Sequence, residues 1–164
     1  MKRQISVADL LFGAGGVLAF LFSFFTFFDY PGSGYDRSAW GSGNFPITTI
    51  PAVLALFAAL LVIFDLFGVN IKLPPNILTL TWPQIRLTWG ITSAVLMLGF
   101  LIEDRGPSIS LSFAAWVMLI GSLAMAAGSI MNVLGKGRDM VNLKLPTTPP
   151  PSPPSPPGGS PNAS

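Results

Sequence analysis

The sequence contains neither cysteine nor histidine, and only 10% of its 164 residues are charged. Without these two residue types the chain cannot form disulfides, and it lacks the ligands of typical zinc sites and of histidine-bound haem. A soluble domain carries about 25% charged residues, whereas here 51% of the residues are hydrophobic and the mean hydropathy is +0.63. We therefore expect lipid, rather than water, to solvate most of this chain.

The few charged residues also argue against two classes of function. The net charge is +2, but the basic residues are scattered and form no patch of the kind that binds nucleic acid. An enzyme needs an acid, a base, a nucleophile or a metal cluster facing one cavity. Without histidine or cysteine, the candidates that could serve are Asp9 with Asp65, or the adjacent Glu103 and Asp104, and adjacent carboxylates in a turn are more often a solvated cap. We expect a non-enzymatic protein with no cofactor, no metal site and no nucleic-acid partner.

The longest apolar run, Leu111 to Leu134, carries no charged side chain over its 24 residues. At about 1.5 Å per residue, such a helix is about 36 Å long and crosses a hydrocarbon core of roughly 30 Å. Small residues in membrane helices let two backbones approach closely. We therefore expect this helix to pack closely against others through small residues. Four of them are seven positions apart, Ala114, Gly121, Gly128 and, just after the run, Gly135, and Ser122 lies beside them.

Three further apolar runs, at about 7–28, 47–68 and 84–102, complete a predicted bundle. The first also fits a signal peptide, because a basic start precedes it. It exceeds 20 residues, however, and ends in aromatic residues rather than the small ones that signal peptidase requires, so we expect it to be retained. The sequence thus predicts an all-α membrane protein, with a four-transmembrane-helix domain over 1–145.

The basic residues predict the orientation of these spans. With four spans both termini share one side of the membrane, and cytoplasmic loops are enriched in Lys and Arg. That side receives seven basic residues, and the other side receives Arg37 and Arg105. We expect a multi-pass protein of the cell membrane with both termini in the cytoplasm. The seven are Lys2, Arg3, Lys72, Arg86, Lys136, Arg138 and Lys144.

Two segments outside the spans are candidates for contacts. Residues 146–164 are rich in proline, which favours an extended, solvated, disordered tail rather than a core. The first loop, residues 29–46, is rich in Gly and Ser and carries Tyr35 and Trp40. Aromatic residues in such a loop are typical of the lipid headgroup region. The more specific alternative is that they contact a ligand or a partner protein.

One ion pair is predicted from helix dipoles. Asp65 lies in the last turn of the second run, where a carboxylate is disfavoured, and Arg86 lies in the first turn of the third run, where a cation is disfavoured. Facing one another they would cancel both penalties. The alternatives are that Lys72 pairs with Asp65, or that each side chain reaches the headgroups separately.

The loop residues Ser38-Ala39-Trp40 follow an aromatic end of the first run and precede a Pro-opened Ala/Leu helix. Together with the Trp-led third run, the Gly/Ala-rich fourth run and the Pro-rich tail, this pattern resembles a family of uncharacterised actinobacterial four-helix integral membrane proteins. The resemblance covers about residues 7–140. It implies a link to the cell envelope and no catalytic residue.

These features are compatible with three functions to different degrees. A membrane scaffold or accessory subunit accounts for the small-residue helix and for a cytoplasmic Pro-rich tail able to bind partners. Its expected partners are the lipid bilayer and other membrane proteins or further copies of itself. A small transporter or channel component is the alternative, although the spans hold no ionisable residue at mid-depth. An intramembrane enzyme ranks third.

Overall fold

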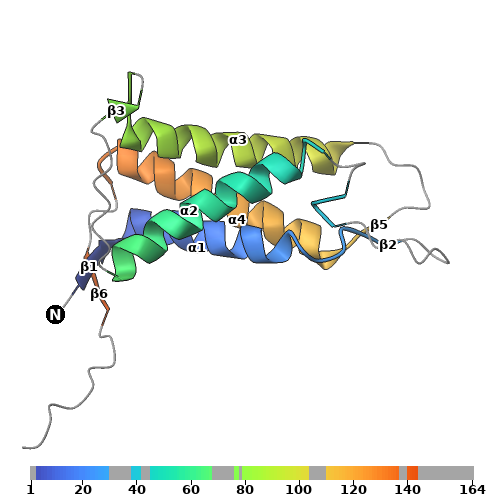
Figure 1. Cartoon of the computed structure of the whole chain (residues 1–164), viewed down its shortest axis with the longest axis horizontal. Coiled ribbons are helices and arrows are strands. Elements are labelled where there is room, and N and C mark those ends of the chain that lie inside the picture. Colours follow the sequence, from blue (N-terminus) through green and yellow to red (C-terminus); the bar gives the residue numbers. More distant parts are fainter. Residues whose placement is uncertain are drawn as a thin grey trace, which may run out of the picture.

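The computed structural model describes residues 3–29, 38–41, 45–67, 76–77, 79–103, 110–136 and 140–143. It contains four helices, α1 (Val7–Phe22), α2 (Thr49–Phe67), α3 (Trp82–Ile102) and α4 (Phe113–Val133). They run between the same two ends of an elongated bundle (Figure 1). By length and composition α2, α3 and α4 are long and apolar enough to cross a membrane, and α1 is a shorter apolar helix of 16 residues.

Short pairs of antiparallel strands lie at the two ends of the bundle. Strand β1 (Arg3–Ser6) pairs antiparallel with β6 (Met140–Leu143), so these two strands lie together at one end of the bundle (Figure 1). At the opposite end β2 (Phe28–Asp29) pairs with β5 (Ser110–Leu111). The third pair joins β3 (Asn76–Ile77) to β4 (Leu80–Thr81) directly before α3. We call the end with the β1–β6 pair the terminal end, and the end with the β2–β5 pair the far end.

Helix α1 ends at Phe22, six residues before the end predicted from the sequence. The hydroxyl of Ser23 donates to the Phe20 carbonyl at 2.6 Å, and its N–H donates to the Ala19 carbonyl at 3.1 Å. Serine favours such local bonds over a continued helix, and the aromatic residues that follow are weak helix formers. The chain then extends to join the β2–β5 pair. The other three helices lie within two residues of their predicted bounds.

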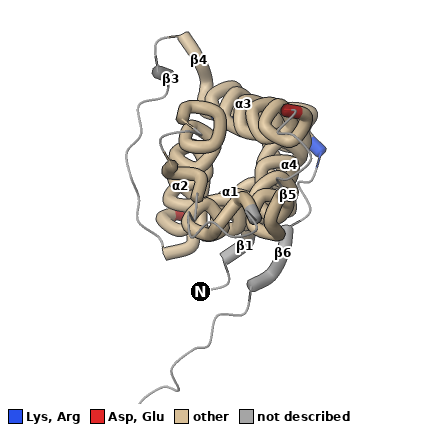
Figure 2. Tube along the Cα trace, turned by 90° about the vertical axis from the view of Figure 1, so that its right-hand side faces the viewer, with Lys and Arg blue, Asp and Glu red and all other residues tan. Residues whose placement is uncertain are grey.

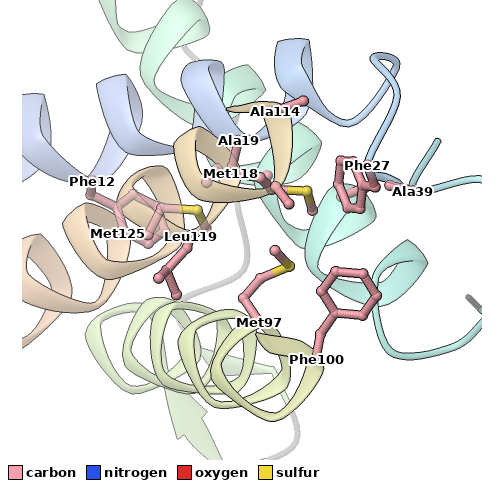
Figure 3. Close-up of a cluster of buried hydrophobic side chains, with 14 of the residues drawn as sticks. Phe12, Ala19, Phe27, Ala39, Met97, Phe100, Ala114, Met118, Leu119 and Met125 are labelled. Atoms are coloured by element: carbon pink, nitrogen blue, oxygen red, sulfur yellow. The ribbon is translucent and has the colours of Figure 1, made fainter. Parts of the chain in front are cut away.

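Seen along the bundle, the four helices are arranged around its axis in the order α1, α2, α3, α4, so that α1 and α3 occupy opposite corners (Figure 2). Helix α4 packs extensively against both α1 and α3, whereas α2 packs mainly on α1. The interior is filled by side chains from all four helices and from the segment after α1. Figure 3 shows Met97 and Phe100 of α3 pointing toward Met118 of α4 and toward Phe27. These four side chains are at most 2% exposed.

Glycines on α1 bring two neighbouring helices close. A Cβ added to Gly15 would lie 2.5 Å from the carbonyl oxygen of Gly121, on α4. A Cβ added to Gly16 would lie 2.9 Å from the carbonyl oxygen of Ala55, on α2. Both distances are too short for real carbon contacts, so glycine is what permits α1 to touch the backbones on either side.

Candidate functional site

A polar cluster lies between three helices at the terminal end of the bundle. Arg86, in the first turns of α3, donates from Nη1 to Oδ1 of Asp9, in the first turn of α1, at 2.6 Å. Their side chains are only 24% and 28% exposed. Because α1 and α3 occupy opposite corners, this ion pair crosses the bundle diagonally.

Further side chains complete the bonding of Asp9. Asn132, in the last turn of α4, donates from Nδ2 to Asp9 Oδ1 at 3.1 Å. Ser6 donates its hydroxyl to Asp9 Oδ2 at 2.6 Å and accepts the Asp9 backbone N–H at 3.1 Å. The carboxylate thereby joins α1, α3, α4 and strand β1. We call Ser6, Asp9, Arg86 and Asn132 the Asp9 cluster.

The ring of Phe12 supports the arginine from within the bundle. The guanidinium carbon of Arg86 lies 5.7 Å from the centroid of that ring, within the range of a cation–π contact. Phe12 itself is 1% exposed, so the arginine crosses an apolar surface before it reaches Asp9. An ion held on an apolar surface depends strongly on its counter-ion.

Local sequence explains why these residues meet. Ser6 is the N-cap of α1, and Asp9 follows three residues later, where the positive end of the helix dipole favours a carboxylate. Arg86 lies near the start of α3, where the dipole disfavours a cation. Both helices start at the terminal end, so the carboxylate of α1 offsets the unfavourable position of Arg86.

The carboxylate that the structure places on Arg86 differs from the one expected. The sequence predicts Asp65 as the partner of Arg86, whereas the ion pair shown at Arg86 is with Asp9. Asp65 is exposed in the last turn of α2, whereas Val62 of the same helix packs against Gly13 of α1. The dipole argument identified the need for a counter-ion at Arg86, but it could not give the rotation of α2 about its axis.

The small residues predicted on the fourth helix have three different environments. Gly121 and Gly128 face α1, where an added Cβ would lie 2.7 Å from the Gly15 carbonyl oxygen and 2.6 Å from the Phe12 nitrogen respectively. Ala114 and Ser122 are buried, at 3% and 0% exposed. The Ser122 hydroxyl has no hydrogen-bond partner within the described part of the chain.

Gly135 lies beyond the end of α4 and terminates it. Its φ of 67° is left-handed, and the N–H of Lys136 donates to the Met131 carbonyl at 2.9 Å. This is the arrangement by which glycine commonly closes a helix. Gly135 is exposed, so its place in the repeat of small residues reflects helix termination instead of helix packing.

At the far end, Trp40 is held against the bundle. Its indole Nε1 donates to the Ser23 hydroxyl oxygen at 3.0 Å, and its ring stacks on Phe24 with centroids 5.7 Å apart. The adjacent Ala39 is fully buried, and its carbonyl accepts hydrogen bonds from the hydroxyls of Thr48 at 2.8 Å and Thr49 at 2.9 Å. Trp40 therefore fastens the loop to the end of α1. Tyr35, the other predicted loop contact, lies outside the described residues.

Replacing Trp40 with Phe should lower the free energy of unfolding by about 1 kcal/mol, because one hydrogen bond to a buried hydroxyl is lost while the stacking on Phe24 is kept. Unfolding in mixed micelles would measure the change. The matched control is Trp116→Phe on α4, since the two indoles are similarly exposed, at 49% for Trp116 and 40% for Trp40, and it is the Trp40 indole that donates to Ser23. An equal effect of the two substitutions would contradict the anchoring role of Trp40.

The chemistry available to the Asp9 cluster is electrostatic. Both oxygens of its carboxylate are occupied by hydrogen-bond donors. Within the described ranges, no group of three or more Asp or Glu residues comes together in a way that could hold a metal ion. The cluster is thus arranged to join helices to one another.

Searches of protein-family models, of curated proteins and of solved structures found no match to this chain.

Proposed function

We propose that this protein is a non-enzymatic membrane scaffold or accessory subunit of a cell-envelope assembly, which crosses the cell membrane four times and presents its Pro-rich tail in the cytoplasm. The observation that carries this proposal is the pairing of β1 with β6. It fixes Met140–Leu143, the last described segment, beside the start of α1 at the terminal end of the bundle. The seven basic residues assigned to that side support a cytoplasmic location.

The packing of the bundle supports a structural role. The wholly buried side chains of Met97, Met118 and Met125 fill the interior between α3 and α4, and Phe27 closes it toward the far end. The charged side chains of the Asp9 cluster bond to one another and thereby connect α1 to α3. A rigid support of this kind leaves recognition to the tail, whose prolines favour the extended conformation that aromatic-lined grooves bind.

A partner-capture experiment tests the role of the tail. Membranes carrying the full-length chain would be crosslinked, and captured proteins compared with those from a variant in which the seven prolines between residues 149 and 157 are alanine. We expect a partner that is lost from this variant and that a synthetic peptide of residues 144–164 also binds. The control variant, Gly158→Ala with Gly159→Ala, keeps every proline and should retain the partner. Equal capture by all variants would contradict the proposal.

The ion pair inside the bundle favours a second candidate, a transporter or channel component. Ionisable residues between membrane helices often mark a path for ions or substrates. Two fully buried hydroxyls without partners in the described part of the chain, on Ser93 and Ser122, extend the polar character inward. Flux of small ions and polar solutes into proteoliposomes, lost on Asp9→Asn, would favour this candidate over the scaffold.

A further inference from the structure

Ser6 belongs both to the β1–β6 pair and to the Asp9 cluster. It is the last residue of β1, where it lies opposite Met140 of β6. Its side chain caps α1 and donates to the carboxylate that also accepts from Arg86. The strand pair is thereby connected to helix α3 through two successive bonds to one carboxylate.

The β1–β6 pair needs such support. A two-stranded ribbon of this length is marginally stable by itself. Two anchors are visible at its α1 end, namely Ile5, which is 3% exposed, and Ser6 with its bonds to Asp9. Whatever moves the Asp9 carboxylate therefore removes one of the anchors that the described side chains provide.

The position of the Asp9 carboxylate depends on Arg86. Each side chain is about three-quarters buried, so either charge is costly without the other. If the guanidinium moves away, the carboxylate gains by turning toward solvent, and this rotation breaks its bond with the Ser6 hydroxyl. Arg86 has an alternative anionic partner nearby, because an arginine close to a helix start can extend to lipid phosphate.

We propose that the Asp9–Arg86 pair is a latch that couples helix α3 to the docking of the β1–β6 pair on the bundle. With the latch closed, β1 and β6 stay docked and fix where the tail begins. With Arg86 drawn to a lipid phosphate, the strand pair loosens and the tail begins from a mobile segment. This regulation rests on the proposed function of the tail, but the latch itself is defined by the described residues alone.

Disulfide crosslinking tests the latch, because the natural chain has no cysteine. Gln4 and Asn142 are opposite one another in β1 and β6, and opposed residues of antiparallel strands have Cα atoms about 4.5–5.5 Å apart, a separation that a disulfide spans. The rate of crosslinking between Gln4→Cys and Asn142→Cys would be measured in the full-length protein. We expect Arg86→Gln, and separately Asp9→Asn, to lower this rate about fivefold or more.

Two controls separate the latch from general stability. Asp29→Cys with Ser110→Cys reports on the β2–β5 pair at the far end and should crosslink at an unchanged rate in the Arg86→Gln background. Lys136→Gln removes an exposed charge beyond the end of α4 and should leave both rates unchanged. Equal slowing of both cysteine pairs, or an unchanged Gln4–Asn142 rate in Arg86→Gln, would overturn the latch. No partner is needed for this readout, so its failure is distinguishable from failure of the proposed tail function.

Discussion

Replacing Gly128 with Ala should lower the free energy of unfolding by about 2 to 3 kcal/mol, the upper part of the range of about 1 to 3 kcal/mol for adding carbon atoms to a packed interior. The added Cβ would lie 2.6 Å from the backbone nitrogen of Phe12 and 2.7 Å from the carbonyl oxygen of Ala8. Both are main-chain atoms of α1, so neither can turn aside, and the two helices must separate. Gly128→Leu should abolish the folded bundle. Unfolding in mixed micelles would measure both variants.

The matched control for this substitution is Gly99→Ala on α3. No heavy atom lies within 4 Å of the position that its Cβ would occupy. Alanine is the better helix former, so the control should be neutral or more stable by up to about 1 kcal/mol. If Gly128→Ala proved as stable as Gly99→Ala, the close packing of α1 on α4 would be wrong.

Removing the carboxylate at position 9 should have an effect of similar size. Asp9→Ala leaves the Arg86 guanidinium about three-quarters buried without its counter-ion, and we expect a loss of about 2 to 3 kcal/mol. In a double-mutant cycle of Asp9→Asn and Arg86→Gln, the losses should be non-additive by about 1 kcal/mol or more, since the two side chains are in direct contact.

Two further cycles identify the partner of Arg86. Glu103→Gln serves as the distant control, because Glu103 follows the last residue of α3 and lies about 25 Å from Arg86 at the rise of an α-helix. Its cycle with Arg86→Gln should be additive within about 0.5 kcal/mol. The cycle of Asp65→Asn with Arg86→Gln examines the pair predicted from the sequence. Coupling there, with additivity at Asp9, would contradict the observed cluster.

The extent of the helices could be predicted from the sequence because hydrophobic length is a strong signal. The bounds of α2, α3 and α4 follow from where the apolar runs begin and end. The early end of α1 could not be predicted in this way, since residues 24–28 are as apolar as the helix before them. There the deciding interactions are Ser23 with Phe20, and Phe27 with Ser112, whose N–H donates to the Phe27 carbonyl at 2.9 Å.

The candidate site could be predicted only in part. The dipole position of Arg86 indicated that it needs a carboxylate, but which carboxylate reaches it depends on how each helix is rotated about its axis, and this is a tertiary property. A local signal was present in Ser6 followed by Asp9 three residues later, a spacing typical of a helix start. Asn132 gave no signal, because a single amide near a helix end is common in any membrane protein.

We expect the chain to cross the membrane four times, although α1 has only 16 helical residues. Single cysteines at residues 2, 41 and 164 of the natural cysteine-free chain, labelled in intact cells with a membrane-impermeant thiol reagent, test this directly. We predict that only the cysteine at residue 41 is labelled before the cells are opened, and that all three are labelled afterwards. Labelling of residues 2 and 164 from opposite sides of the membrane would contradict the four-span account.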